Sequence, residues 1–176
     1  GTTTQSAAYA ATRLQLADPL KLILGARVSN WTREEDVAVW TPAAYAIRHR
    51  GVVTPYAGLV FDLSEHVSAY ASYADIFKPQ TARDRFGGYL DPLQGKSYEA
   101  GLKGEFLSGR LNASAAVFRT EQANFAVADG GLLVPGTATP AFRAADGVVA
   151  RGYELELTGQ VAPRWELSVG WTQFSA

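Results

Sequence analysis

Hydrophobic and polar residues alternate with a period of two between Gly95 and Phe125. In the first half of this stretch every second residue is apolar or small, namely Tyr98, Ala100, Leu102, Gly104 and Phe106. The positions between them carry polar groups, glycine and both signs of charge, namely Ser97, Glu99, Gly101, Lys103 and Glu105. Because successive side chains of a strand point to opposite faces, this pattern predicts a strand with one apolar face. The tight turn Leu107–Arg110 then predicts a hairpin to a second strand.

The same alternation predicts three further hairpins, each closed by a short turn that contains Pro, Asp or Ser. Their strand pairs are Gln5–Ala17 with Leu20–Trp31, Val52–Leu63 with Val67–Phe77, and Val149–Val161 with Trp165–Phe174. The connections between hairpins are longer, and we expect loops at Thr32–Gly51, Lys78–Gly95 and Ala126–Val148, the last a loose Gly-, Pro-, Ala- and Thr-rich segment. Strict alternation of short turns and long loops is typical of transmembrane β-barrels, whose turns are periplasmic and whose loops are extracellular.

Strand length separates a barrel from a soluble sandwich. The predicted segments run to roughly 10 to 13 residues, whereas ordinary strands have about 5 or 6. Trp165 and Trp171 lie on one apolar face about 20 Å apart, a spacing that suits two interfacial aromatic girdles. The opposite faces carry Gly, Ser, Thr, Asn and many charges, which suits a wide, hydrated lumen or contact with a polar plug. The predicted fold is all-β, an antiparallel up-and-down transmembrane β-barrel segment of about eight strands in four hairpins.

Composition narrows the possible functions. The 176 residues are 47% hydrophobic, 11% aromatic and 19% charged, with a net charge of −1 and a pI near 6.2. This charge gives no attraction for nucleic acid. There is no Cys, which excludes disulfides and thiolate metal sites. The chain opens at Gly1 in polar sequence that leads into a strand, so we expect it to be a segment of something longer.

Four ordered blocks of sequence resemble a known family. They are YASYADIFKPQ (70–80), YLDPLQGKSYEAGLKGEF (89–106), GRLNASAAVFRTEQANFA (109–126) and DGVVARGYELELTGQVAPRWELSVGW (146–171). The chain resembles the TonB-dependent ferric-siderophore receptors from about Tyr9 onward, in the branch with the ferripyoverdine and ferric-coprogen receptors. The resemblance implies an outer-membrane barrel of about 22 strands around an N-terminal plug. Residues 1–176 would be part of the barrel domain, with the plug domain, the TonB box and the C-terminal strands outside this chain.

The resemblance implies binding and transport in the outer membrane of a Gram-negative bacterium, and no catalysis. A ferric siderophore brings its own metal ligands, so no cofactor is expected beyond the iron of that ligand. The implied partners are the ferric siderophore, TonB with ExbB and ExbD acting through the plug, and lipopolysaccharide or other outer-membrane lipid.

Candidate ligand-binding residues lie on the loop side and are aromatic or basic, as a bulky polar chelate requires. The set comprises Trp31, Trp40, Tyr45, Arg48, Phe77 and Tyr89. His49, Arg83, Arg85 and Phe86 lie at the same rim. The alternative for Trp31 and Phe77 is a place in the aromatic girdle, and for the arginines contact with lipopolysaccharide phosphates or solvent.

Other polar groups offer no pattern of catalysis. Glu154 and Glu156 would share a face about 7 Å apart, but neighbouring same-face positions on any hydrated strand have that spacing. His49 and His66 fall at opposite rims, so they cannot share a metal. Two rival functions stay open at this point: a receptor of the same architecture for haem, cobalamin or a glycan, and a soluble β-sandwich binding module.

Overall fold

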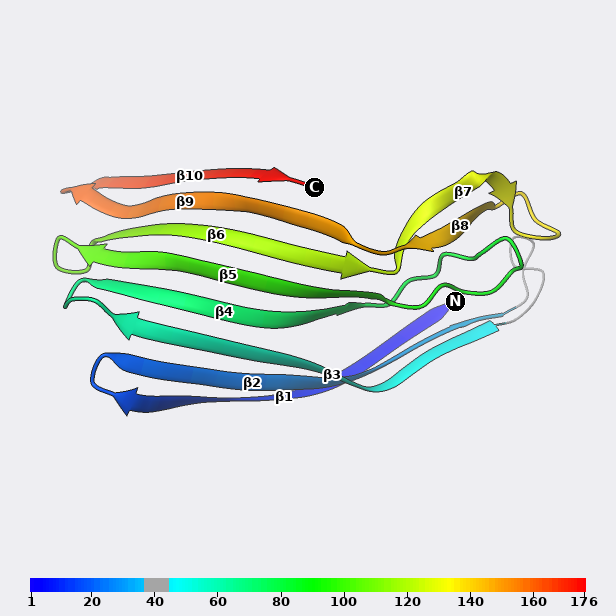
Figure 1. Cartoon of the computed structure of the whole chain (residues 1–176), viewed down its shortest axis with the longest axis horizontal. Coiled ribbons are helices and arrows are strands. Elements are labelled where there is room, and N and C mark those ends of the chain that lie inside the picture. Colours follow the sequence, from blue (N-terminus) through cyan, green and yellow to red (C-terminus); the bar gives the residue numbers. More distant parts are fainter. Residues whose placement is uncertain (37–44) are drawn as a thin grey trace.

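The computed structural model describes residues 1–36 and 45–176, so the candidate Trp40 lies outside the described residues. These residues form ten strands (Figure 1). Their bounds are β1 Thr2–Ala17, β2 Leu20–Glu35, β3 Tyr45–Asp62, β4 Val67–Lys78, β5 Leu93–Phe106, β6 Leu111–Ala123, β7 Phe125–Leu133, β8 Pro140–Ala145, β9 Val148–Ala162 and β10 Trp165–Ser175. Within the same ranges no helix is long and apolar enough to cross a membrane.

Eight of the strands build one open antiparallel sheet in the order β1-β2-β3-β4-β5-β6-β9-β10, and β7 pairs separately with β8. Figure 1 shows the four tight turns at one end of the sheet, which we call the turn end, and the long connections with the β7–β8 hairpin at the loop end. The predicted eight-stranded up-and-down sheet, its four hairpins and its sorted connections are confirmed.

Two of the three predicted loops consist largely of strand. The segment Ala126–Val148 was expected to be loose, but most of it forms the β7–β8 hairpin. In Thr32–Gly51, β2 continues to Glu35 and β3 starts at Tyr45, with Thr32 opposite Arg48. A bulge at Gly51 (φ 63°) shifts the register by one residue between the pairs Ser29–Val52 and Trp31–His49, and the Gly51 amide donates to Asn30 Oδ1 at 2.8 Å. Continued pairing satisfies the backbone N–H and C=O groups of these connections, and it does not need an alternation of apolar residues.

The two faces of the sheet have opposite chemistry. One row of paired residues across five strands is apolar: Ala69, Leu102, Ala115, Leu155 and Trp171. The next row, on the other face, is polar or glycine: Ser68, Lys103, Ser114, Glu156 and Gly170. We call these the outer and inner faces. The inner face carries a cavity of about 340 Å³ beside Tyr70, Glu99 and Glu154.

The described residues form a single layer with almost no interior. The buried apolar residues among them are Val134 and Ala141, 2% and 1% exposed, and both belong to the β7–β8 segment. Large outer-face side chains such as Leu102 and Trp171 are 48% and 58% exposed. A soluble sandwich needs two sheets packed face to face, whereas the eight long strands form one open sheet, so the sandwich alternative is wrong. An exposed apolar outer face is typical of the lipid-facing side of a transmembrane barrel.

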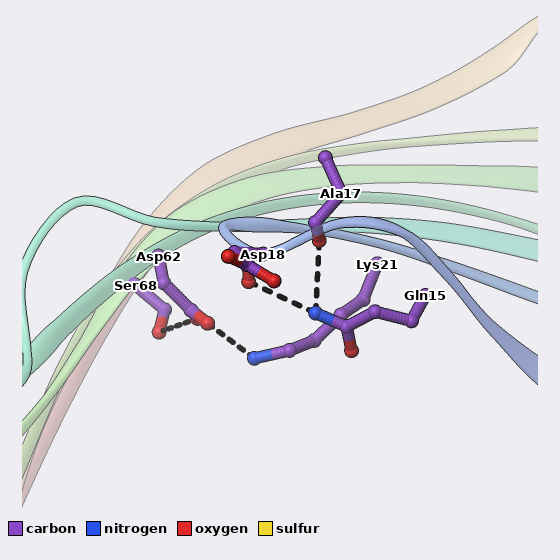
Figure 2. Close-up of polar contacts among 6 residues, drawn as sticks. All are labelled: Gln15, Ala17, Asp18, Lys21, Asp62 and Ser68. Atoms are coloured by element: carbon purple, nitrogen blue, oxygen red, sulfur yellow. Dashed lines mark hydrogen bonds and ion pairs between the residues drawn. The ribbon is translucent and has the colours of Figure 1, made fainter.

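Polar contacts join neighbouring hairpins at the turn end (Figure 2). Lys21 of β2 forms an ion pair with Asp62 of β3, and Ser68 of β4 donates to Asp62 Oδ1 at 2.8 Å. Gln15 closes the first turn by donating to the carbonyl oxygens of Ala17 and Asp18 at 2.8 and 2.9 Å. The contacts through Asp62 therefore hold the ends of β2, β3 and β4 together on the inner face, close to the turns.

Candidate ligand-binding cleft at the loop end

Three segments far apart in sequence converge at the loop end: the ends of β2 and β3, the β4–β5 connection, and the β7–β8 hairpin (Figure 1). They enclose a cleft of about 440 Å³, which we call the rim cleft. It is lined by Arg33, Glu35, Tyr45, Thr81, Ala82, Arg83, Tyr89, Val134, Thr137, Thr139 and Phe142. Clefts of this size hold small ligands, and their few polar groups set the ligand's orientation.

Arg83 lies between two tyrosine rings at the centre of the cleft. The rings of Tyr45 and Tyr89 are 4.8 Å apart between centroids. The Arg83 guanidinium carbon is 5.1 Å from the Tyr45 ring and 4.4 Å from the Tyr89 ring, and the guanidinium donates to the Tyr89 hydroxyl. Cation–π attraction and the hydrogen bond therefore hold a positive charge over aromatic surface.

A second guanidinium borders the same tyrosine. Arg33 Nε donates to Tyr45 Oη at 3.4 Å, and Arg33 forms an ion pair with Glu35. Burial raises the pKa of Tyr45 above its ordinary value, and the hydrogen bond from Arg33 lowers the pKa of Glu35. The cleft therefore brings together the two guanidinium groups of Arg33 and Arg83, the Glu35 carboxylate and the neutral phenol of Tyr45, with a surplus of one positive charge.

The loop that carries Arg83 and Tyr89 is tied to the β7–β8 hairpin. The Phe142 amide donates to the Arg83 carbonyl oxygen at 2.8 Å. Arg85 forms an ion pair at 2.8 Å with Asp129, whose side chain is 9% exposed. At the base of the loop, the Asn124 side chain donates to the Pro92 carbonyl oxygen at 3.0 Å. The β4–β5 connection and the β7–β8 hairpin therefore support each other as one unit, which we call the loop unit, and this unit fixes one wall of the cleft.

The whole of residues 1–176 matches the family model described as TonB dependent receptor-like, beta-barrel. The chain belongs to the TonB-dependent receptors. It is 46% identical over 172 residues to the ferric-pyoverdine 358 receptor of Pseudomonas putida, which covers 96% of this chain and 21% of that receptor. It is 40% identical over 175 residues to the ferripyoverdine receptor of Pseudomonas aeruginosa, covering 97% and 20%.

Solved structures of receptors have the same sheet. The alcaligin outer-membrane receptor of Bordetella pertussis is 44% identical with a TM-score of 0.81, and the match covers 98% of this chain and 30% of that one. The ferripyoverdine receptor of the outer membrane of Pseudomonas aeruginosa, bound to ferripyoverdine, is 36% identical with a TM-score of 0.80, covering 98% and 22%. The chain spans about a fifth of the length of these curated relatives. The family resemblance read from the sequence is confirmed.

The receptor structure sorts the candidate residues into groups. Tyr45 and Tyr89 meet in the rim cleft. Trp31 and Phe77 lie outside it, joined through His49, whose ring is 5.8 Å from Trp31 and 5.6 Å from Phe77. Arg48 belongs to neither group and pairs with Glu34 at 2.8 Å, with both side chains more than half exposed.

Sequence reasoning missed Arg33, Glu35 and Phe142 as cleft residues. Arg33 and Glu35 continue the period-two pattern of β2 beyond Trp31, so extending the strand would have placed them on one face. Phe142 has no such signal, because its position depends on the pairing of β8 with β7. Among the described residues no group of three or more His, Asp or Glu side chains is placed to hold a metal ion.

Proposed function

We propose that the protein containing this chain is an outer-membrane receptor of a Gram-negative bacterium that takes up ferric siderophores. The observation that carries this proposal is the receptor sheet, which this chain shares at 36–46% identity with receptors named for ferric pyoverdine and alcaligin. The rim cleft at the loop end supports it, since cleft and sheet together supply a recognition surface above a membrane wall.

The proposed ligand class is a ferric hydroxamate or mixed-type siderophore. Such a chelate supplies all the ligands of its iron, so the receptor needs aromatic surface and hydrogen-bond donors and no metal-binding side chain. Tyr45 and Tyr89 offer ring surface, and the guanidinium groups of Arg33 and Arg83 offer donors to the chelate's oxygen atoms. The iron is cargo, and the proposed role is binding and transport without a bond-making step.

Release from the barrel requires work that the sheet itself does not supply. In this proposal TonB, with ExbB and ExbD, pulls on a plug domain encoded outside residues 1–176, and the inner-membrane proton gradient provides the energy. The polar inner face, with Glu99, Lys103 and Glu156, forms the hydrated wall along which the ligand passes.

The test is uptake of radioactive iron by cells in which the gene has been deleted and then restored, in a strain without a second receptor for the same ligand. Ferric hydroxamate and mixed-type siderophores should support uptake only in the restored strain, and a proton uncoupler should stop it. Equal uptake with and without the gene would refute the proposal, and gene-dependent uptake of haem, cobalamin or a glycan instead would assign the receptor to that substrate.

A further inference from the structure

One positive charge of the rim cleft has no partner among the described carboxylates. Arg33 forms an ion pair with Glu35, but the part of the chain that the structure describes has no carboxylate within ion-pair distance of Arg83. The remaining residues, 37–44, contain no Asp or Glu. This chain therefore leaves the charge of Arg83 without an opposite charge at the centre of the cleft.

The carboxylate next to Arg83 in the sequence is already engaged. Asp84 Oδ1 accepts hydrogen bonds from the amides of Phe86 and Gly88 at 2.9 and 2.8 Å, which closes the turn that follows Arg83. Among the described residues the Arg83 guanidinium makes one hydrogen bond, to the Tyr89 hydroxyl. Since a guanidinium carries several N–H donors in a planar fork, donors of Arg83 are available to a ligand.

The surroundings of Arg83 favour one planar anion. The half-buried guanidinium lies 5.1 and 4.4 Å from the rings of Tyr45 and Tyr89, so ring surface replaces part of its hydration shell. Where water is excluded, a charge-assisted hydrogen bond is stronger, and a planar carboxylate accepts two parallel N–H···O bonds from one guanidinium. The Glu35 carboxylate of the same cleft repels a second negative charge, so the surplus of one positive charge matches a monoanion.

The cleft has room for part of a siderophore. Its volume of about 440 Å³ is in the lower part of the range of about 300 to 1,000 Å³ for clefts that hold drug-sized ligands, whereas a hexadentate ferric chelate is at the upper end of that size class. The oxygen atoms that bind iron share their charge with Fe³⁺, but a carboxylate on a side arm keeps its full charge. The group that suits Arg83 is therefore a free carboxylate on a side arm of the chelate.

We propose that the rim cleft binds a free carboxylate on a side arm of a ferric hydroxamate siderophore, and that Arg83 selects this anionic arm over a neutral or cationic one. The guanidinium fork donates to the two carboxylate oxygens, and Tyr45 and Tyr89 hold the fork in place. Arg83 is then a specificity-determining residue. This inference rests on the proposed function and adds to it a preference for the charge of the ligand.

The test measures the binding of three ferric complexes that share one chelate core and differ in the charge of one arm. The probes are ferric desferrioxamine B, whose arm ends in an ammonium group, its N-succinyl derivative, whose arm ends in a carboxylate, and the primary amide of that carboxylate. Affinity for the full receptor, purified in detergent, is measured by fluorescence quenching. The succinyl complex should bind about 10-fold more tightly than the amide complex, which is the difference between a charge-assisted and a neutral hydrogen bond. The ammonium complex should bind most weakly.

Two substitutions in the cleft should change this preference in opposite directions. Arg83→Gln removes the positive charge, so the succinyl and amide complexes should bind within about twofold of each other. Glu35→Gln removes the opposing carboxylate and frees the guanidinium of Arg33, so the preference for the succinyl complex should exceed that of the wild type. The matched control Arg48→Gln removes an arginine of the same rim outside the cleft and should keep the wild-type preference. A damaged cleft would weaken all three complexes alike, so the Glu35→Gln result decides even if Arg83→Gln does not fold.

Equal binding of the succinyl and amide complexes by the wild type would overturn the inference. A wild-type preference that persists in Arg83→Gln would also overturn it, because the carboxylate would then be recognised elsewhere in the receptor. Binding of all three complexes without preference would leave the proposed function intact, since uptake of a chelate does not require a charged arm. Failure of all three to bind would overturn the inference as well, and gene-dependent iron uptake would then decide separately whether the proposed function stands.

Discussion

Replacement of Arg83 by alanine should disturb the rim cleft more than any other single change there. The substitution removes two cation–π contacts, at 5.1 and 4.4 Å, and the hydrogen bond to Tyr89. Each cation–π contact at a partly exposed site contributes about 0.5 to 1 kcal/mol, and the hydrogen bond about 1 kcal/mol. The cleft therefore loses about 2 to 3 kcal/mol of interactions that hold Tyr45 and Tyr89 together.

If this geometry recognises the chelate, the loss appears as weaker ligand binding. We expect Arg83→Ala to lower the affinity for the ferric siderophore by about 30- to 150-fold. Arg83→Lys keeps the charge without the planar fork, so its effect should be intermediate. The assay is quenching of the receptor's intrinsic fluorescence on titration with the ferric siderophore, with folding checked by heat-dependent gel migration.

The control is Arg48→Ala, which removes an arginine of the same rim from an exposed ion pair outside the cleft. An exposed pair of this kind contributes at most about 1 kcal/mol to stability, and we expect no change in ligand affinity. Binding by Arg83→Ala within about twofold of the wild type, in a folded receptor, would show that the rim cleft does not recognise the ligand.

Three shorter predictions concern the wall, the loop unit and pH. A Cβ on Gly152 would lie 2.2 Å from the Gln173 carbonyl oxygen, whereas one on Gly170 meets nothing within 4 Å. Gly152→Ala should therefore lower the stability of the folded barrel by about 1 to 3 kcal/mol and lower the temperature at which it unfolds on gels, and Gly170→Ala should do neither. Arg85→Ala leaves the nearly buried Asp129 carboxylate unpaired, so limited proteolysis should cut the β4–β5 connection faster than in wild type, and an unchanged rate would contradict the proposed loop unit. The pKa of Glu35 is lowered and that of Tyr45 is raised. The stabilisation from the Glu35 carboxylate is therefore present above about pH 4.3 and lost below it, while the stabilisation from the neutral Tyr45 phenol lasts to about pH 10. Siderophore affinity should be constant from about pH 6 to 9, and a titration step inside that range would refute these assignments.

Local pattern was enough to predict the sheet because each strand and turn carries its own signal. In β5, Tyr98 and Glu99 already show which face meets lipid, and Ser108–Gly109 marks the turn. The β7–β8 hairpin was missed because its strands are short and interrupted by Gly130 and Gly131, both with positive φ. Its contacts with the β4–β5 connection, through Phe142 and Asp129, lie outside any local window of sequence.

The rim cleft was predictable only in part, because it depends on contacts between segments far apart in the sequence. Tyr45 and Tyr89 were identified by residue type and position at the rim, yet 44 residues separate them in sequence. Their meeting depends on the bulge at Gly51, which sets the register of β3, and on the ties that hold the β4–β5 loop. The alternation of residues gives no information on how three loops converge.

In the proposed receptor, β9 is a membrane-spanning wall strand with lipid on one face and hydrated lumen on the other. This chain has no Cys, and any Cys elsewhere in the full receptor is first replaced. Single cysteines at Leu155 and Glu156, adjacent residues on opposite faces, then carry spin labels in the full receptor reconstituted in bilayers. The label at position 155 should be relaxed by oxygen dissolved in the lipid and shielded from a polar nickel complex, and the label at position 156 should show the reverse. Equal access of the polar complex to both positions would contradict the membrane-spanning sheet on which the proposed receptor depends.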